Sequence, residues 1–295
     1  MKLRDAGLLL LLAALWGASF LFIRVAVPVM GPFPLVAVRV MVGGGILVVY
    51  AMRIRNALHW RSHWRKYLLI GLLNNAIPFT LISTAQLNLT ASFAALLNAT
   101  TPLFSVLIAA LWIQEKVTPA KLVGILLGMV GVSIIVGWRP EPLDMLHLVS
   151  VALMLGATFS YGLAAVYGKI AFKDVNPLST SIGQLLSASV LILPLALLNP
   201  PAHRIEATTI IAVVGLATLS TALAYLIYFR LIASAGPTPA ASVTLLIPFF
   251  SSLWGAVFLG ERLELNEILG FAIILIGLLL VTGLWQQVSR KPLPA

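Results

Sequence analysis

The chain has 295 residues, of which 60% are hydrophobic and only 9% are charged, and its mean hydropathy is +1.04. Because soluble domains carry about 25% charged residues, this composition excludes an ordinary soluble enzyme and a disordered chain. The net charge of +10 is scattered over short loops, which favours membrane orientation over nucleic-acid binding, and the absence of cysteine excludes disulfides and thiol chemistry.

Long apolar runs predict ten membrane-spanning helices, since one span needs about 20 residues. Uninterrupted runs such as GLLLLLAALWG favour helices over barrel strands, in which apolar and polar residues alternate. The first run is too long for a cleaved signal peptide and is predicted to stay in place. The predicted spans are 8–27, 34–51, 67–86, 92–112, 120–138, 148–171, 178–198, 208–233, 239–259 and 267–285.

Positive charges predict how these spans are oriented. With the N-terminus in the cytoplasm, 14 of the 19 Lys and Arg residues fall on the cytoplasmic side. Four fall on the other side, namely Arg24, Arg139, Arg204 and Arg262. Short cytoplasmic loops concentrate Lys and Arg, so both termini are predicted to be cytoplasmic.

An internal repeat divides the chain into residues 1–138 and 139–295. A shift of 146 residues aligns 101–137 with 247–283, and nine of the 36 pairs from residue 102 onward are identical. Each half contains five spans, an odd number, so the halves have opposite orientations, as in many transporters. The most informative identities are Pro102/Pro248, Glu115/Glu261, Gly124/Gly270, Gly131/Gly277 and Gly137/Gly283.

Three segments carry a resemblance to a known family: LWGASFLFIRVA (15–26), LLIPFFSSLWGAVFLGERL (245–263) and LGFAIILIGLLLVTG (269–283). Over residues 6–285 the sequence resembles the EamA family of the drug/metabolite transporter superfamily, and within it bacterial YddG-type amino acid exporters. One departure is Gln114, where the family pattern has Gly before Glu115. The resemblance implies ten spans in two five-span repeats and export or exchange of amino acids and other small metabolites.

Polar and aromatic residues inside the spans are the candidate substrate-binding residues. Amides and hydroxyls suit the charged groups of a small zwitterion, and rings suit its apolar body; the same residue types also bridge membrane helices. The candidates are Trp16, Ser19, Phe20, Asn74, Asn75, Asn98, Thr101, Tyr161, Thr221, Tyr225 and Thr244.

Other residues within or beside the spans allow two interpretations. Pro102 and Pro248 act either as hinges, which we favour, or as packing features. Arg39, within the second span, either snorkels outward, which we favour, or meets a substrate carboxylate. Glu115 and Glu261 are expected to order turns or helix N-termini rather than bind substrate.

These observations predict a multi-pass exporter in the inner membrane for aromatic and other apolar or small amino acids, or related metabolites. Transport would proceed by alternating access around a midplane cavity between the two repeats. All nine acidic residues lie at span ends or in loops, which favours export without proton coupling.

The alternative within the superfamily is multidrug or other metabolite efflux. An enzyme would need a nucleophile–base pair or metal ligands at depth, and the spans supply neither. A channel or receptor would not require inverted repeats. The sequence therefore predicts no catalytic residue, no cofactor and no metal; the expected partners are a small-molecule substrate and the lipid bilayer, with the protein as a monomer or weak dimer.

Overall fold

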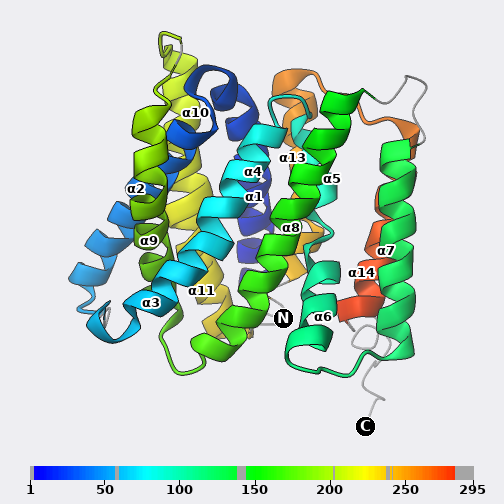
Figure 1. The fold of residues 1–295 in the computed structure, drawn as a ribbon, viewed down its shortest axis with the longest axis horizontal. Helices are drawn as coiled ribbons and strands as arrows, with labels where there is room; N and C mark the ends of the chain where they lie inside the picture. Colours follow the sequence, from blue (N-terminus) through cyan, green and yellow to red (C-terminus); the bar gives the residue numbers. More distant parts are fainter. Residues whose placement is uncertain are drawn as a thin grey trace.

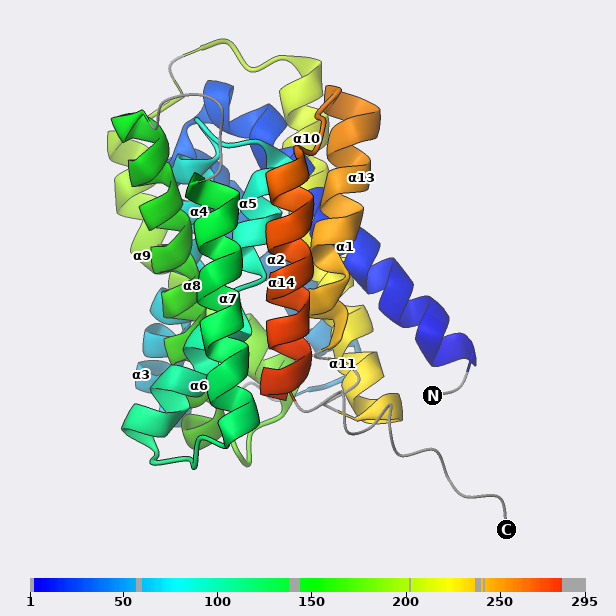
Figure 2. The same cartoon turned by 90° about the vertical axis from the view of Figure 1, so that its right-hand side faces the viewer.

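The computed structural model describes residues 3–56, 60–137, 144–201, 203–236, 240 and 242–282. All regular secondary structure in these residues is helical. Figure 1 shows the helices lying roughly alongside one another as a bundle, and Figure 2 shows α1 steeply tilted against α14. Hydrocarbon offers the backbone no hydrogen-bond partner, so long apolar segments form helices, in which the N–H and C=O groups bond to one another.

The first half of the chain contains α1 (Leu3–Met30), α2 (Pro32–Arg53), α3 (Trp60–Gly71), the π-helical segment η1 (Leu72–Ala76), α4 (Ile77–Ala85), α5 (Ala91–Asn98), α6 (Thr101–Trp112) and α7 (Pro119–Gly137). The second half contains α8 (Met145–Ala171), α9 (Pro177–Leu198), α10 (Ala207–Ala217), the π-helical segment η2 (Thr218–Leu223), α11 (Ala224–Ala235), the 3-10 helix η3 (Ser242–Leu245), α13 (Ile247–Leu259) and α14 (Leu265–Thr282).

Seven segments in the described residues are long and apolar enough to cross a membrane, and three further apolar helices are shorter. They coincide with the predicted spans to within a few residues, except that the first and third helices begin earlier than predicted. The predicted span residues 138, 239, 241 and 283–285 lie outside the described residues. The seven segments are Leu3–Met30, Pro32–Arg53, Trp60–Ala85, Ala91–Trp112, Met145–Ala171, Pro177–Leu198 and Ala207–Ala235, and the three shorter helices are Pro119–Ile135, Val243–Leu259 and Leu265–Val281.

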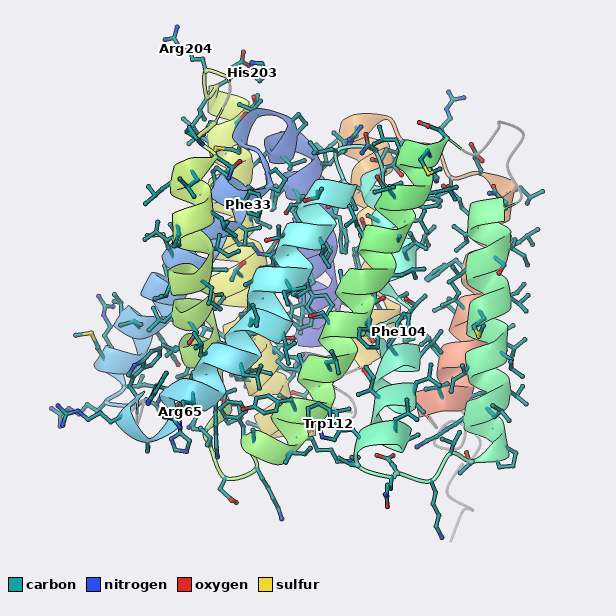
Figure 3. The ribbon with its side chains drawn as sticks, viewed as in Figure 1. Phe33, Arg65, Phe104, Trp112, His203 and Arg204 are labelled. Carbon is teal, nitrogen blue, oxygen red and sulfur yellow. The ribbon has the colours of Figure 1, made fainter. Side chains whose placement is uncertain are left out.

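Local capping fixes where several helices begin. Asp144 accepts a hydrogen bond from the Leu146 N–H at the start of α8, and Asn176 accepts one from the Leu178 N–H at the start of α9. These side chains satisfy N–H groups that have no partner within the helix. Arg65 and Arg204 lie at opposite ends of the bundle (Figure 3), as the predicted orientation requires.

Two prolines mark equivalent breaks in the two halves. The predicted span 92–112 is not one continuous helix: it divides at Ala99–Thr100 into α5 and α6. Pro102 lies in the first turn of α6, and Pro248 lies in the first turn of α13, which follows η3. Proline is accommodated in a first turn because the N–H that it lacks has no helical partner there. Both prolines therefore stand at the beginning of a helix rather than inside a kinked one.

The third span of each half contains a π-helical segment. Residues 72–76 of η1 correspond under the shift of 146 to residues 218–222 of η2. Pro78 follows η1 and donates no N–H, while Thr221 in η2 donates its hydroxyl to the Leu216 carbonyl at 2.8 Å. Such segments widen a helix by one residue per turn and frequently occur at functional sites.

Helices α7 and α14 stand side by side at one edge of the bundle (Figures 1 and 2) and pack through glycines. A Cβ on Gly124 would lie 2.5 Å from the Gly277 carbonyl oxygen, and one on Gly131 would lie 2.6 Å from the Gly270 carbonyl oxygen. The earlier glycine on α7 meets the later one on α14, so the helices are antiparallel. Side chains cannot fit between backbones at this distance.

Glu261 joins the loop after α13 to the N-terminus of α5. Its carboxylate accepts hydrogen bonds from the N–H groups of Ala91 and Ser92, at 2.8 and 3.0 Å, and from the Ser92 hydroxyl at 2.5 Å. The expectation that Glu261 orders a helix N-terminus is confirmed, although the helix is α5 and not the one that follows it. Charge-assisted bonds to a helix N-terminus are among the stronger ones.

Glu115, the equivalent residue in the first half, makes different contacts. It pairs with Lys121 at 2.9 Å and Lys169 at 3.2 Å, and these ammonium groups lower the pKa of its carboxyl. Preceding it, Gln114 adopts a φ of 53°, close to the 66° of Gly260 before Glu261. The two turns thus share a left-handed residue, and glycine adopts this conformation at less cost than glutamine.

We predict that Gly131→Ala lowers the melting temperature of the detergent-purified protein, whereas Gly45→Ala leaves it unchanged or raises it. The new Cβ at position 131 meets backbone on α14, and such overpacking costs about 1–3 kcal/mol. A Cβ at position 45 meets nothing within 4 Å, so only the better helix propensity of alanine acts there. Equal melting temperatures for the two variants would contradict the close packing of α7 and α14.

A second prediction concerns the Glu261 cap. Glu261→Ala removes the acceptor for three donors and should cost about 1.5–3 kcal/mol. Glu115→Ala is the matched control, because exposed ion pairs contribute about 0–1 kcal/mol. Thermal unfolding monitored by tryptophan fluorescence measures both. The cap is not needed for stability if Glu261→Ala unfolds no earlier than Glu115→Ala.

Candidate functional site

The candidate site is built around a buried arginine on α2. Arg39 is 7% exposed, and its guanidinium carbon lies 3.6 Å from the centroid of the Phe79 ring on α4. Its Nε donates a hydrogen bond to the Thr221 hydroxyl of η2 at 3.1 Å. The prediction that Arg39 snorkels outward is therefore wrong: a ring face and a hydroxyl hold the guanidinium inside the bundle.

A glutamine on α9 connects two other parts of the site. The Nε2 of Gln184 donates to the Tyr225 hydroxyl on α11 at 3.2 Å, and its Oε1 accepts from the Asn74 amide of η1 at 2.9 Å. Gln184 is 4% exposed. One side chain thus ties the third span of each half to α9.

Two further polar side chains complete the group. Asn75 is fully buried and faces the Tyr225 hydroxyl, but its amide atoms make no hydrogen bond of good geometry. Tyr161 on α8 and Tyr225 both pack against the buried apolar group that contains Phe79. We call the following residues the Arg39 cluster: Arg39, Asn74, Asn75, Phe79, Tyr161, Gln184, Thr221 and Tyr225.

The π-helical segments explain why these side chains meet. Asn75 and Thr221 occupy equivalent positions in η1 and η2, and Phe79 and Tyr225 are equivalent one turn later. Arg39 contacts Phe79 from the first half and Thr221 from the second. The guanidinium therefore lies between corresponding parts of the two third spans.

The candidates on α1 lie at the margin of the cluster. The Trp16 ring lies 5.4 Å from the Tyr228 ring, and Ser19 donates its hydroxyl to the Trp16 carbonyl. Phe20 is buried in the apolar core, and its carbonyl accepts a hydrogen bond from Gln86. Rings on α11 connect Trp16 to the cluster, since Tyr228 contacts Phe229 and Phe229 stacks on Tyr225.

The remaining candidates lie at the breaks in the fourth and ninth spans. The hydroxyl of Thr101 donates to the Asn98 carbonyl, and the buried Oδ1 of Asn98 has no hydrogen-bond partner among the described residues. Thr244 is half-buried in η3. Neither Asn98 nor Thr101 makes a hydrogen bond to the Arg39 cluster in the described part of the chain. The structure thus brings five of the eleven candidates together: Asn74, Asn75, Tyr161, Thr221 and Tyr225.

Sequence reasoning left three members of the cluster out of the candidate set. Arg39 was assigned to the membrane surface, and Phe79 looks like any apolar residue of a span. Gln184 could have been identified as a candidate from the sequence. Burying its amide in an apolar span is as costly as burying the amide of Asn75, which was a candidate. The partners of all three come from distant parts of the chain.

The cluster combines one positive charge with neutral donors and acceptors. The polar groups of the cluster are one guanidinium, three amides and three hydroxyls. Phe79, Tyr161 and Tyr225 supply apolar ring surface. Groups of this kind bind small molecules that have an acidic or polar end and an apolar body. No set of three or more His, Cys, Asp or Glu residues in the described ranges is arranged to hold a metal ion.

Comparison with known proteins places this architecture in context. A family model described as the EamA-like transporter family matches residues 5–137 and again residues 148–283. The uncharacterized transporter YvbV of Bacillus subtilis is 28% identical over 284 residues, which cover 95% of this chain and 92% of that protein.

Two further relatives also align over nearly their whole length. Protein PecM of Dickeya dadantii is 25% identical, with 99% of this chain and 96% of PecM covered. The uncharacterized inner membrane transporter YedA of Escherichia coli is 25% identical, with coverage of 98% and 94%. A solved crystal structure with 19% identity matches 98% of this chain and 100% of its own at a TM-score of 0.68, so it shares the fold.

Proposed function

The chain belongs to the EamA-like transporter family, and we propose that it exports amino acids or closely related small metabolites by alternating access. YvbV and YedA are named as transporters, YedA in the inner membrane, so the chain is a multi-pass inner-membrane transporter and not an enzyme. The observation that carries the substrate proposal is the Arg39 cluster. Its members come from both halves of the chain and lie at least six residues from either end of their spans.

The proposed mechanism uses the two halves as inverted repeats, residues 1–138 and 139–295, with five spans each and both termini in the cytoplasm. Three observations support this division. The family model matches each half separately, and the π-helical segments have equivalent positions. The shift of 146 residues also relates the contact of Gly124 with Gly277 to that of Gly270 with Gly131. Related halves can adopt each other's arrangement, which opens a central site first to one side and then to the other.

The chemistry of the cluster favours aromatic and other apolar or small amino acids. Rings line the cluster for an apolar body, and its amides and hydroxyls are suited to polar end groups. Its positive charge disfavours the lipophilic cations that a multidrug pump typically carries. We also propose that Pro102 and Pro248 act as hinges, because both stand where a span is broken in equivalent positions.

Counterflow of radiolabelled Phe, Met and Thr in proteoliposomes tests this proposal. We expect saturable, trans-stimulated uptake that does not change when a pH gradient is imposed. The acidic residues within the described helices support uncoupled transport, since Asp5 and Glu267 both lie in first turns. Uptake that requires the gradient would contradict uncoupled export, and no uptake of any of the three would contradict the substrate class.

Two substitutions test the site itself. Tyr225→Leu removes the acceptor of the Gln184 hydrogen bond, and Asn74→Leu removes the amide that donates to the Gln184 Oε1. Each should lower counterflow at least tenfold without loss of folded protein, as judged by gel filtration. Tyr50→Leu is the matched control, because Tyr50 is 41% exposed at the end of α2. Wild-type flux in both variants would refute the site.

A further inference from the structure

The charge of Arg39 has no counter-ion among the residues that the structure describes. Among the described residues its only hydrogen bond is the one from Nε to Thr221, and no described carboxylate lies within 4.0 Å of the guanidinium. Arg24 differs, since its Nη1 donates to the carbonyls of Gln86 and Leu87 and its side chain is only half-buried. An arginine at membrane depth costs about 2.5–3.5 kcal/mol on insertion scales and more in simulation, so this charge calls for compensation.

The contacts that Arg39 does make leave its binding edge available. Nε donates its hydrogen bond to the Thr221 hydroxyl, and the guanidinium lies over the Phe79 ring. Both Nη groups remain unused by the described residues. Two parallel N–H groups at the end of a planar fork match the two oxygens of a carboxylate, and this bidentate pairing is stronger than a bond between neutral groups.

The surroundings of Arg39 are neutral, which restricts the ligand further. Tyr161 and Tyr225 supply hydroxyls, and Asn75 supplies an amide that has no hydrogen-bond partner among the described residues. The cluster contains no acidic side chain that could pair with an ammonium group. One guanidinium balances one negative charge, which favours a carboxylate over a dianionic phosphate.

We propose that Arg39 binds the substrate carboxylate and that the transported compounds are monocarboxylates, for which the carboxylate is required and the amino group is dispensable. This inference rests on the proposed function, because it specifies the substrate class of the same site. It reaches beyond amino acids: an aromatic or aliphatic acid without an amino group should be accepted as well.

Inhibition of Phe counterflow in proteoliposomes tests the inference with four compounds, each of which contains a phenyl ring. Phenylalanine and 3-phenylpropionate keep the carboxylate, whereas phenylalaninamide and phenethylamine lack it. We expect the first two to inhibit Phe counterflow by the wild-type protein at least tenfold more strongly than the last two. Equal inhibition by phenylalanine and phenylalaninamide would overturn the inference.

Substitution of Arg39 gives the second arm of the test. Arg39→Gln should lower Phe flux at least tenfold and abolish the preference for carboxylates in the flux that remains. Arg39→Lys keeps the charge but loses the planar fork, so it should retain the preference with weaker inhibition. Arg24→Gln is the matched control and should behave as wild type. An unchanged preference in Arg39→Gln would overturn the inference, and if that variant does not fold, loss of the preference in Arg39→Lys would overturn it.

A binding measurement separates this inference from the proposed function. A ligand that binds the folded protein raises its melting temperature, so the same four compounds are tested by thermal shift on purified wild-type protein. Stabilisation by 3-phenylpropionate but not by phenylalaninamide, without Phe flux, would support the Arg39 site and refute amino acid export. Phe flux without a difference between the carboxylates and the amide would keep amino acid export and refute the role of Arg39.

Discussion

A guanidinium in the interior of a membrane protein must be compensated by its surroundings, and the centre of this protein is arranged around that requirement. Arg39 on α2 is 7% exposed and is held by the face of Phe79 and the hydroxyl of Thr221. Both partners come from third spans that contain a π-helical segment, and the widened turns change which side chains face the arginine. The remaining donors of the guanidinium are the basis of the proposed carboxylate-binding site.

The two halves repeat one another in backbone geometry but not in every contact. The π-helical segments, the prolines that begin α6 and α13, and the glycines between α7 and α14 all correspond under a single shift of 146 residues. The paired glutamates do not match in the same way. Glu261 binds the N-terminus of α5, while Glu115 pairs with Lys121 and Lys169. Positions that correspond under this shift therefore hold different contacts.

Much of this fold could be predicted from the sequence, because membrane helices follow local composition. Apolar runs gave the spans to within a few residues, and the identities at Pro102/Pro248 and Gly131/Gly277 fall at equivalent structural positions. The break between α5 and α6 was not foreseen, since Ala99 and Thr100 carry no strong turn signal. The centre of the site was also missed: whether Arg39 turns inward depends on Phe79 and Thr221, which are 40 and 182 residues away along the chain.

If transport proceeds by alternating access, the Arg39 cluster lies on a substrate path that opens in turn to both sides of the membrane. Because the chain has no native cysteine, Thr221→Cys places a single thiol beside the guanidinium, in a variant whose counterflow is first shown to be retained. The measurement is the rate at which membrane-impermeant maleimide labels this thiol in right-side-out and inside-out vesicles. Alternating access predicts labelling from either side, slowed several-fold by saturating phenylalanine. Labelling from neither side, from one side only, or at a rate that phenylalanine does not change would contradict it.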